Sequence, residues 1–152
     1  MPRTTIAKEF TFDAAHALGS GYDGLCRFIH GHTYRVRIEL TAPDLDRFGM
    51  VADFGSLKPV KQWIDAYLDH CLILNGTDDK HTALYDAMVD LGDGFRRVHL
   101  LDSNPTAENI AALILDEARR ILGGVVFAVT VWETPTAYAR VTIDLQEDNN
   151  VS

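Results

Sequence analysis

An alternation of apolar and polar residues in two stretches near the start of the chain constrains its fold more than any other feature. In the first stretch, the even positions from Ile6 to Leu18 form one largely apolar face. In the second, which begins at His30, the inward-facing positions are His32, Tyr34, Val36, Ile38 and Leu40. This period of two is typical of β-strands that bury one face. If the two strands pair as an antiparallel hairpin, His16 at the end of the first lies beside His30 and His32.

Helical spacing replaces the alternation after residue 55. Apolar positions recur as expected for an amphipathic helix that ends near Asp69 and His70, and these positions are Leu57, Val60, Ile64 and Tyr67 or Leu68. The segment from about 76 to 103 mixes a short helical pattern with glycine and charge. We interpret this segment as an inserted loop region, and its histidines His81 and His99 as surface or loop residues.

A second helix and a closing hairpin are predicted in the last third of the chain. Asn104 can cap a helix and Pro105 suits its first position. Glu108 adds an acid to the first turn, and the helix is predicted to run to about Leu122, where two glycines end it. Residues 125–133 and 137–145 then read as two strands joined across residues 134–136.

The predicted order of elements is therefore β-β-α-α-β-β. With 152 residues, of which 47% are hydrophobic, the chain can bury a core without disulfides or metal. We expect one domain over residues 1–152, with the region from about 76 to 103 inserted between the two helices.

Charge and cysteine content narrow the class of function. The formal net charge is −8 and no run of lysine or arginine is present, which disfavours binding to nucleic acid or to an anionic membrane. A small-molecule ligand is favoured instead. Two cysteines are too few for a disulfide framework, and neither a secretory leader nor a membrane span is apparent. The expected location is the cytoplasm.

Three histidines could form a metal site. Neutral imidazoles are good ligands for Zn²⁺, and a catalytic zinc site typically has three protein ligands and an open position. His16, His30 and His32 supply that number if the predicted strands pair. The alternative is that one or two of them are ordinary, partly buried histidines, but the convergence of all three favours the metal site.

Other side chains suggest acid–base and binding roles, each with a structural alternative. Cys26, four positions before His30, could be a base or nucleophile beside the metal, or a small buried hydrophobe. Asp69 and His70 could form an acid–base pair, or could be a surface acid and a histidine at a helix end. Glu133 ends an apolar strand face and could accept two parallel N–H groups from a pterin or guanine, or could turn to solvent.

Taken together, these motifs resemble the 6-pyruvoyltetrahydropterin synthase and 6-carboxytetrahydropterin synthase family over nearly the whole chain. The resemblance rests on FTFDAAH, C-x3-HGH, VADFGSLK, LDH, NPTAEN and WETPTAYA. It implies the T-fold (tunnelling fold), an α+β fold whose four-stranded antiparallel sheet carries two helices on one face. It also implies a homo-oligomer, a trimer or hexamer, with active sites at subunit interfaces.

The resemblance assigns a role to each candidate residue. His16, His30 and His32 would bind zinc, Cys26 would be the catalytic thiol, and Asp69 with His70 would complete the proton-transfer set. Glu133 would hold the pterin ring. Thr106 and Glu108 would help to shape the pterin pocket, although helix capping also explains them. Apart from the resemblance, the triphosphate could be bound by Arg27, Lys8, Arg3 or an arginine of a neighbouring subunit.

The implied reaction converts 7,8-dihydroneopterin triphosphate to 6-carboxy-5,6,7,8-tetrahydropterin, acetaldehyde and triphosphate, a step toward queuosine and related deazapurines. The three-residue gap between Cys26 and His30 resembles the carboxy-forming branch of the family. Ala17 follows His16 where carboxy-forming members often carry a basic residue, so the triphosphate contacts are unassigned. Alternatives are the pyruvoyl-forming activity or another dihydropterin substrate, a three-histidine zinc hydratase or hydrolase, and a non-catalytic pterin- or purine-binding module.

Overall fold

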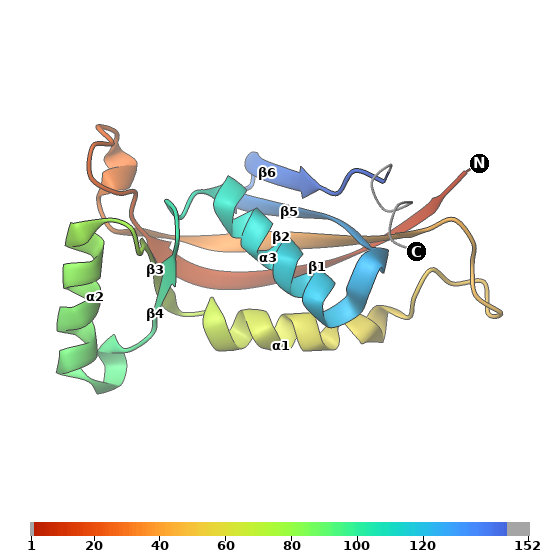
Figure 1. Cartoon of the computed structure of the whole chain (residues 1–152), viewed down its shortest axis with the longest axis horizontal. Coiled ribbons are helices and arrows are strands. Elements are labelled where there is room, and N and C mark those ends of the chain that lie inside the picture. The colour runs from red at the N-terminus through yellow and green to blue at the C-terminus, as the bar shows by residue number, and fades with distance from the viewer. Residues whose placement is uncertain (1, 146–152) are drawn as a thin grey trace.

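The computed structural model describes residues 2–145, which form one mixed β-sheet with helices packed on it (Figure 1). The strands are β1 (Thr4–His16), β2 (His30–Ala42), β3 (Cys71–Asn75), β4 (Val98–Leu101), β5 (Val126–Thr134) and β6 (Ala137–Thr142). The α-helices are α1 (Lys58–Tyr67), α2 (Asp79–Leu91) and α3 (Ala107–Leu122). Short 3-10 turns cover Leu25–Arg27, Phe54–Leu57, Asp93–Phe95 and Gly123–Val125.

The long hairpin of β1 and β2 is the centre of the sheet. The two strands pair antiparallel from Thr4 opposite Ala42 to His16 opposite His30, which confirms the predicted hairpin. Every second side chain is buried from Phe12 to His16 of β1 and from Tyr34 to Leu40 of β2, and the rings of Phe12 and Tyr34 stack across the strands at 4.9 Å between centroids. Burial of every second side chain fixes the register, because a slip of one residue would turn the apolar face to solvent.

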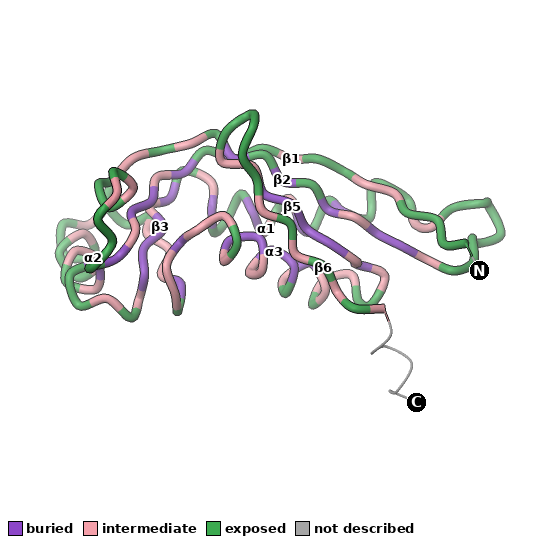
Figure 2. The backbone as a smooth tube through the Cα atoms, turned by 90° about the horizontal axis from the view of Figure 1, so that it is seen from above, coloured by how far each residue is buried: buried purple, intermediate pink, exposed green. Residues whose placement is uncertain are grey.

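Helices α1 and α3 cover one face of this hairpin and of β5 (Figures 1 and 2). Their apolar stripes are fully buried, at Val60 and Ile64 of α1 and at Ile110 and Ile114 of α3. Leu68 rather than Tyr67 completes the stripe after α1, since Leu68 is buried and Tyr67 is exposed. Burial of each such side chain stabilises the fold by about 1.5–3 kcal/mol. No helix within residues 2–145 is long and apolar enough to cross a membrane.

The expectation of a four-stranded antiparallel sheet is wrong. The sheet has six strands in the order β4-β3-β1-β2-β5-β6, and β3 and β4 run parallel to β1. Strand β3 precedes the segment from 76 to 103, and β4 lies within it. The segment is not a loop region, because it also contains α2, which matches the short helical pattern in its sequence. Strand β3 is almost wholly buried between β1 and β4, so its sequence is a short apolar run without the alternation that marked β1 and β2.

Two local predictions also need correction. Helix α3 is capped by Thr106, whose Oγ1 accepts from the Asn109 amide at 3.3 Å, and not by Asn104. Asn104 instead accepts hydrogen bonds from the Gly19 amide and the Asn75 side chain. His81, expected at the surface, is only 9% exposed in α2. The predicted end of α3 at Leu122 and the hairpin of β5 with β6 are both confirmed.

Candidate metal centre and active site

The ends of β1 and β2 bring the imidazoles of His16, His30 and His32 together. The Nε2 atoms of His16 and His30 lie 3.0 Å apart, and those of His32 and His16 lie 3.2 Å apart. The pairing explains this arrangement, since His16 is opposite His30 and Ala14 is opposite His32 on the inward face. The predicted convergence of the three histidines is therefore confirmed, and they form a group that could hold a metal ion.

The hydrogen bonds of the opposite ring nitrogens show that the cluster suits a cation. His16 Nδ1 lies 2.7 Å from the Pro105 carbonyl oxygen, and His30 Nδ1 lies 2.7 Å from that of Phe28. A carbonyl oxygen can only accept, so both Nδ1 atoms carry the proton and both neutral rings present an Nε2 lone pair. Two lone pairs that face each other at 3.0 Å cannot form a hydrogen bond. A metal ion bound by both nitrogens resolves this conflict.

Burial favours the neutral forms of His16 and His32. Desolvation lowers the pKa of His16 below its ordinary value, although the Pro105 carbonyl and the Glu133 carboxylate act in the opposite direction. Desolvation also lowers the pKa of His32. A metal ligand must be the unprotonated imidazole, so both shifts favour metal binding at neutral pH.

A cavity of about 290 Å³ opens beside the cluster, and we call it the histidine cavity. Many of the predicted site residues line this cavity, namely His16, Cys26, Thr106, Glu108 and Glu133. Glu133 Oε1 lies 4.0 Å from His16 Nε2. The cavity thus combines a candidate metal site, a thiol and two carboxylates, which is a set able to bind a polar ring and to transfer protons beside it.

Arg27 lies apart from this set. Its Nη1 donates to the Asp23 carbonyl at 3.2 Å, and its guanidinium is 4.7 Å from the centroid of the Phe28 ring. It lines a different cavity, which is bordered by the loop of residues 17–29 and by helix α2. The structure therefore does not bring Arg27 into the histidine cavity.

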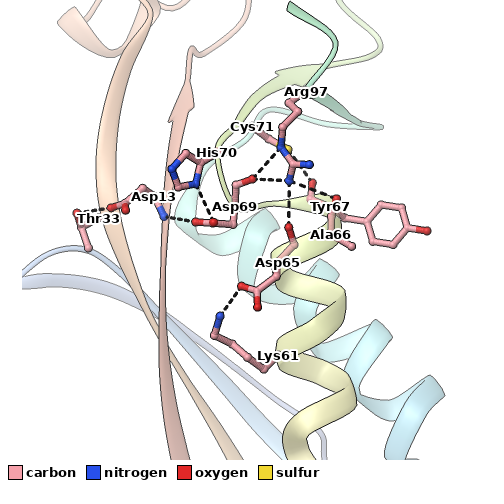
Figure 3. A network of polar contacts seen from close by, with 10 residues as sticks. All are labelled: Asp13, Thr33, Lys61, Asp65, Ala66, Tyr67, Asp69, His70, Cys71 and Arg97. Carbon is pink, nitrogen blue, oxygen red and sulfur yellow. Dashed lines mark hydrogen bonds and ion pairs between the residues drawn. The ribbon is translucent and has the colours of Figure 1, made fainter. Parts of the chain in front are cut away.

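The pair Asp69 and His70 lies in the turn between α1 and β3. His70 Nδ1 is 2.7 Å from Asp69 Oδ2, and Asp69 Oδ1 accepts from the Asp13 amide at 2.9 Å (Figure 3). His70 borders a cavity of about 600 Å³ whose other lining includes the outward-facing Asp13 and Thr33. This cavity also borders His32, but Cys26 and Glu133 are not among its lining residues within the described part of the chain.

The geometry of the pair suits proton transfer. Burial raises the pKa of Asp69, but the hydrogen bonds from the Asp13 amide and from His70 outweigh it and lower the pKa below the ordinary value. The carboxylate therefore holds the proton of His70 on Nδ1 and leaves Nε2 to exchange protons. His70 itself has a φ of 59°, a left-handed conformation that is uncommon for a residue with a side chain.

Three features of the site escaped the sequence analysis. The carbonyls of Pro105 and Phe28 orient two of the histidines, and a backbone carbonyl has no signature in a sequence. Arg97 donates to the carbonyl oxygens of Asp65 and Asp69, and so ties the end of α1 to the start of β4 (Figure 3). Tyr34 packs edge-on to His16 and His32, and its position two residues after His32 was the available signal.

Comparisons with known proteins identify the family to which this chain belongs. The family model of 6-pyruvoyl tetrahydropterin synthase matches residues 5–144, and the chain belongs to this family. Proteins named 6-carboxy-5,6,7,8-tetrahydropterin synthase are 37% identical in Rickettsia felis and 34% identical in Haemophilus influenzae. Each match covers 88% of this chain, with 96% of the Rickettsia protein and 94% of the Haemophilus protein.

Solved structures show the same fold. An uncharacterized protein from Wolinella succinogenes is 28% identical, with a TM-score of 0.82 over 95% of this chain and 100% of that chain. The 6-pyruvoyl tetrahydropterin synthase of Caenorhabditis elegans has a TM-score of 0.68 at 23% identity, over 95% of this chain and 98% of that chain. The fold of the family is thus established for this chain.

Proposed function

We propose that the protein is a zinc-dependent lyase that converts 7,8-dihydroneopterin triphosphate to 6-carboxy-5,6,7,8-tetrahydropterin, acetaldehyde and triphosphate, with consumption of water. The observation that carries the proposal is the histidine cavity, where His16 of the three-histidine cluster, Cys26 and Glu133 lie together. The names of the relatives in Rickettsia felis and Haemophilus influenzae support the carboxy-forming reaction in particular.

His16, His30 and His32 would hold the zinc ion. Three neutral imidazoles suit Zn²⁺ and leave a position open, as catalytic zinc sites require. The bound ion would supply a Lewis acid that polarises the side-chain oxygens of the substrate and acidifies the adjacent protons. The Nδ1 hydrogen bonds of His16 and His30 to backbone carbonyls would hold the two rings in the ligating orientation.

Cys26 and the Asp69–His70 pair would transfer protons in the reaction. Cys26 lines the histidine cavity, as His16 does, and its thiol would remove a proton from the substrate's side chain. His70 Nε2 would accept or return a proton. The hydrogen bond between Asp69 and His70 Nδ1 would fix the tautomer of the ring. His70 is well exposed on its own chain, so it is accessible to a substrate held by another chain.

Glu133, Thr106 and Glu108 would bind the substrate in the histidine cavity. The Glu133 carboxylate would accept two N–H groups from the amino-pyrimidinone edge of the pterin, a bidentate arrangement with charge-assisted hydrogen bonds. Thr106 and Glu108, in the first turn of α3, border the same cavity and would limit the position of the ring.

We further propose that the active enzyme is a homo-oligomer, a trimer or hexamer, whose sites form between chains. The supporting observation is that Cys26 and His70 border different cavities of one chain. A second copy that presents its Asp69–His70 pair to the histidine cavity would complete the proposed set. Two free cysteines, one of them proposed as the reactive thiol, further suggest a reducing compartment such as the cytoplasm.

The pyruvoyl-forming reaction is the second candidate. It is supported by the family model and by the C. elegans neighbour, both of which carry the name 6-pyruvoyl tetrahydropterin synthase. This reaction eliminates triphosphate from the same substrate but keeps the side-chain carbons, so it yields no acetaldehyde.

Product analysis separates the two candidates. The zinc-loaded protein is incubated with 7,8-dihydroneopterin triphosphate, acetaldehyde is trapped, and pterins are identified by mass spectrometry. We expect acetaldehyde and 6-carboxytetrahydropterin, both lost in Cys26→Ala and in protein stripped of metal with a chelator. A pyruvoyl product without acetaldehyde would assign the second candidate, and unchanged substrate would contradict both.

A further inference from the structure

A second cavity lies beside the histidine cavity and has no role in the site described so far. It has a volume of about 490 Å³ and lies between the loop of residues 17–29 and helix α2, and we call it the loop cavity. Figure 1 shows this loop and α2 at the same end of the sheet. Leu18 and Tyr22 line both cavities, so the two are direct neighbours. A ligand that extends from the histidine cavity could therefore reach the loop cavity.

His81 supplies a donor beside the loop cavity, and the donor atom itself is not fully buried. His81 lines it and is 9% exposed, and its Nδ1 accepts a hydrogen bond from the Asn75 amide at 2.9 Å. Because the amide can only donate, Nδ1 carries no proton, and the proton of the neutral ring is on Nε2. That N–H has no hydrogen-bond partner among residues 2–145. A donor without a partner is favourable only when water or a ligand supplies an acceptor.

The charged groups around the loop cavity favour an anionic ligand. Arg27 and Lys80 both line it, and neither forms an ion pair within the described residues. The one acidic lining residue is Asp23. Asp78 lies close by, but its carboxylate accepts from the amides of Ser20, Lys80 and His81. The lining residues thus carry a net positive charge in a chain whose net charge is −8, and the ionised Asp78 lies beside them.

The walls of the cavity are fixed relative to each other. Asp78, the N-cap of α2, accepts from the Ser20 amide at 2.5 Å, and Asn104 accepts from the Gly19 amide at 2.8 Å. A Cβ atom at Gly19 would lie 2.8 Å from the Asn104 side chain, so a larger residue would displace that side chain. The loop that carries Arg27 is therefore held against the helix that carries Lys80 and His81.

We propose that the loop cavity binds the triphosphate group of the substrate through Arg27, Lys80 and the Nε2–H of His81. This inference rests on the proposed function, and it gives a role to the segment from 76 to 103. Phosphate oxygens accept from all three donors, and charge-assisted hydrogen bonds to phosphate are the stronger kind. The pterin would remain in the histidine cavity, and the side chain of the substrate would pass Leu18 and Tyr22.

Calorimetric titration with inorganic triphosphate tests the site without any requirement for turnover. We expect binding to the zinc-loaded wild-type protein, weakened roughly tenfold by Lys80→Ala and by Arg27→Ala because each removes a charged hydrogen bond. The matched control Lys58→Ala removes an exposed lysine of α1 that does not line the cavity, and should bind as the wild type does. The affinity should fall as salt rises.

Steady-state kinetics provide the second measurement. With 7,8-dihydroneopterin triphosphate, Lys80→Ala should raise KM by a similar factor and change kcat much less. Triphosphate binding that is lost in both variants would support the inference even if the proposed reaction were not found. The inference would be overturned if Lys80→Ala turned over the substrate with the KM of the wild type and both variants bound triphosphate as the wild type does. That outcome would leave the proposed function intact. Absence of triphosphate binding to the wild type would also overturn the inference.

Discussion

The hydroxyl of Tyr34 is the one buried side-chain polar atom in residues 2–145 without a hydrogen-bond partner. Burial also raises the pKa of this phenol, so it stays protonated at neutral pH. An unsatisfied buried hydroxyl destabilises a fold by about 1–3 kcal/mol. Its ring, by contrast, stacks well on Phe12.

Tyr34→Phe should therefore stabilise the metal-free protein, by about 1 kcal/mol, because it removes the unsatisfied group and keeps the ring. Urea denaturation measures the change. The control Tyr138→Phe alters a tyrosine that is 61% exposed, and its effect should stay within about 0.5 kcal/mol. A loss of stability in Tyr34→Phe alone would mean that the hydroxyl has a partner in solution.

Asp78 makes stability depend on pH in the acid range. Three backbone amides donate to its carboxylate, and the hydrogen bond from Ser20 contributes most to lowering its pKa to about 2. Because the folded pKa is below the unfolded value, the stabilisation is complete above about pH 4. It is lost as pH falls through the folded pKa.

Asp78→Asn should consequently be less stable than the wild type at pH 7, and the difference should shrink between about pH 4 and pH 2. Urea midpoints measured across this range give the two curves. Asp86→Asn, at an exposed position later in α2, controls for the loss of one negative charge. A gap that stays constant down to pH 2 would contradict the account of Asp78.

At the level of single residues, the histidine cluster could be predicted because strand alternation and antiparallel pairing determine which side chains meet. The burial of His81 could not, since it depends on α2 packing against β3. That His70 and Cys26 line different cavities could not be predicted either, because it depends on where the end of α1 lies relative to the sheet.

Among the secondary-structure elements, the connection from α1 to β3 depends on Arg97. Its guanidinium donates to the carbonyls of Asp65, Ala66 and Asp69, with the shortest distance of 2.6 Å to Asp69 (Figure 3). These carbonyls belong to the end of α1, where backbone acceptors lack helical partners. The arginine thus holds the turn that carries Asp69 and His70.

Arg97→Ala should lower the free energy of unfolding by about 1 kcal/mol and increase amide exchange at His70 and Cys71. If the reaction uses His70, kcat should fall and its pH profile should shift, because the ring is less well positioned. Arg96→Ala, the neighbouring exposed arginine, is the matched control. Unchanged exchange in Arg97→Ala would show that the turn is held by other contacts.

Elements with long periodic patterns were predictable, and short buried ones were not. The pairs β1 with β2 and β5 with β6, and helices α1 and α3, each left an amphipathic signal. Strands β3 and β4 have five and four residues and lie at one side of the sheet, next to the helix α2 that joins them. Short apolar runs cannot be distinguished from buried helix segments by periodicity.

For the whole molecule, the sheet ends in two open edges at β4 and β6. Unpaired edges are sites at which another chain can add. Cys26 and His70 also border different cavities of one chain. Both observations fit an oligomer in which each active site combines residues of two different copies. The central claim is therefore that one reaction requires Cys26 from one chain and Asp69–His70 from another.

Mixing two inactive variants tests this claim most directly. Cys26→Ala and His70→Ala are each purified, shown to be inactive in acetaldehyde release, then unfolded and refolded together in equal amounts. If sites are shared between chains, about one quarter of the sites in randomly mixed oligomers recover both groups, and activity returns to a similar fraction of the wild-type value. Mixed oligomers that form but stay inactive would contradict the claim.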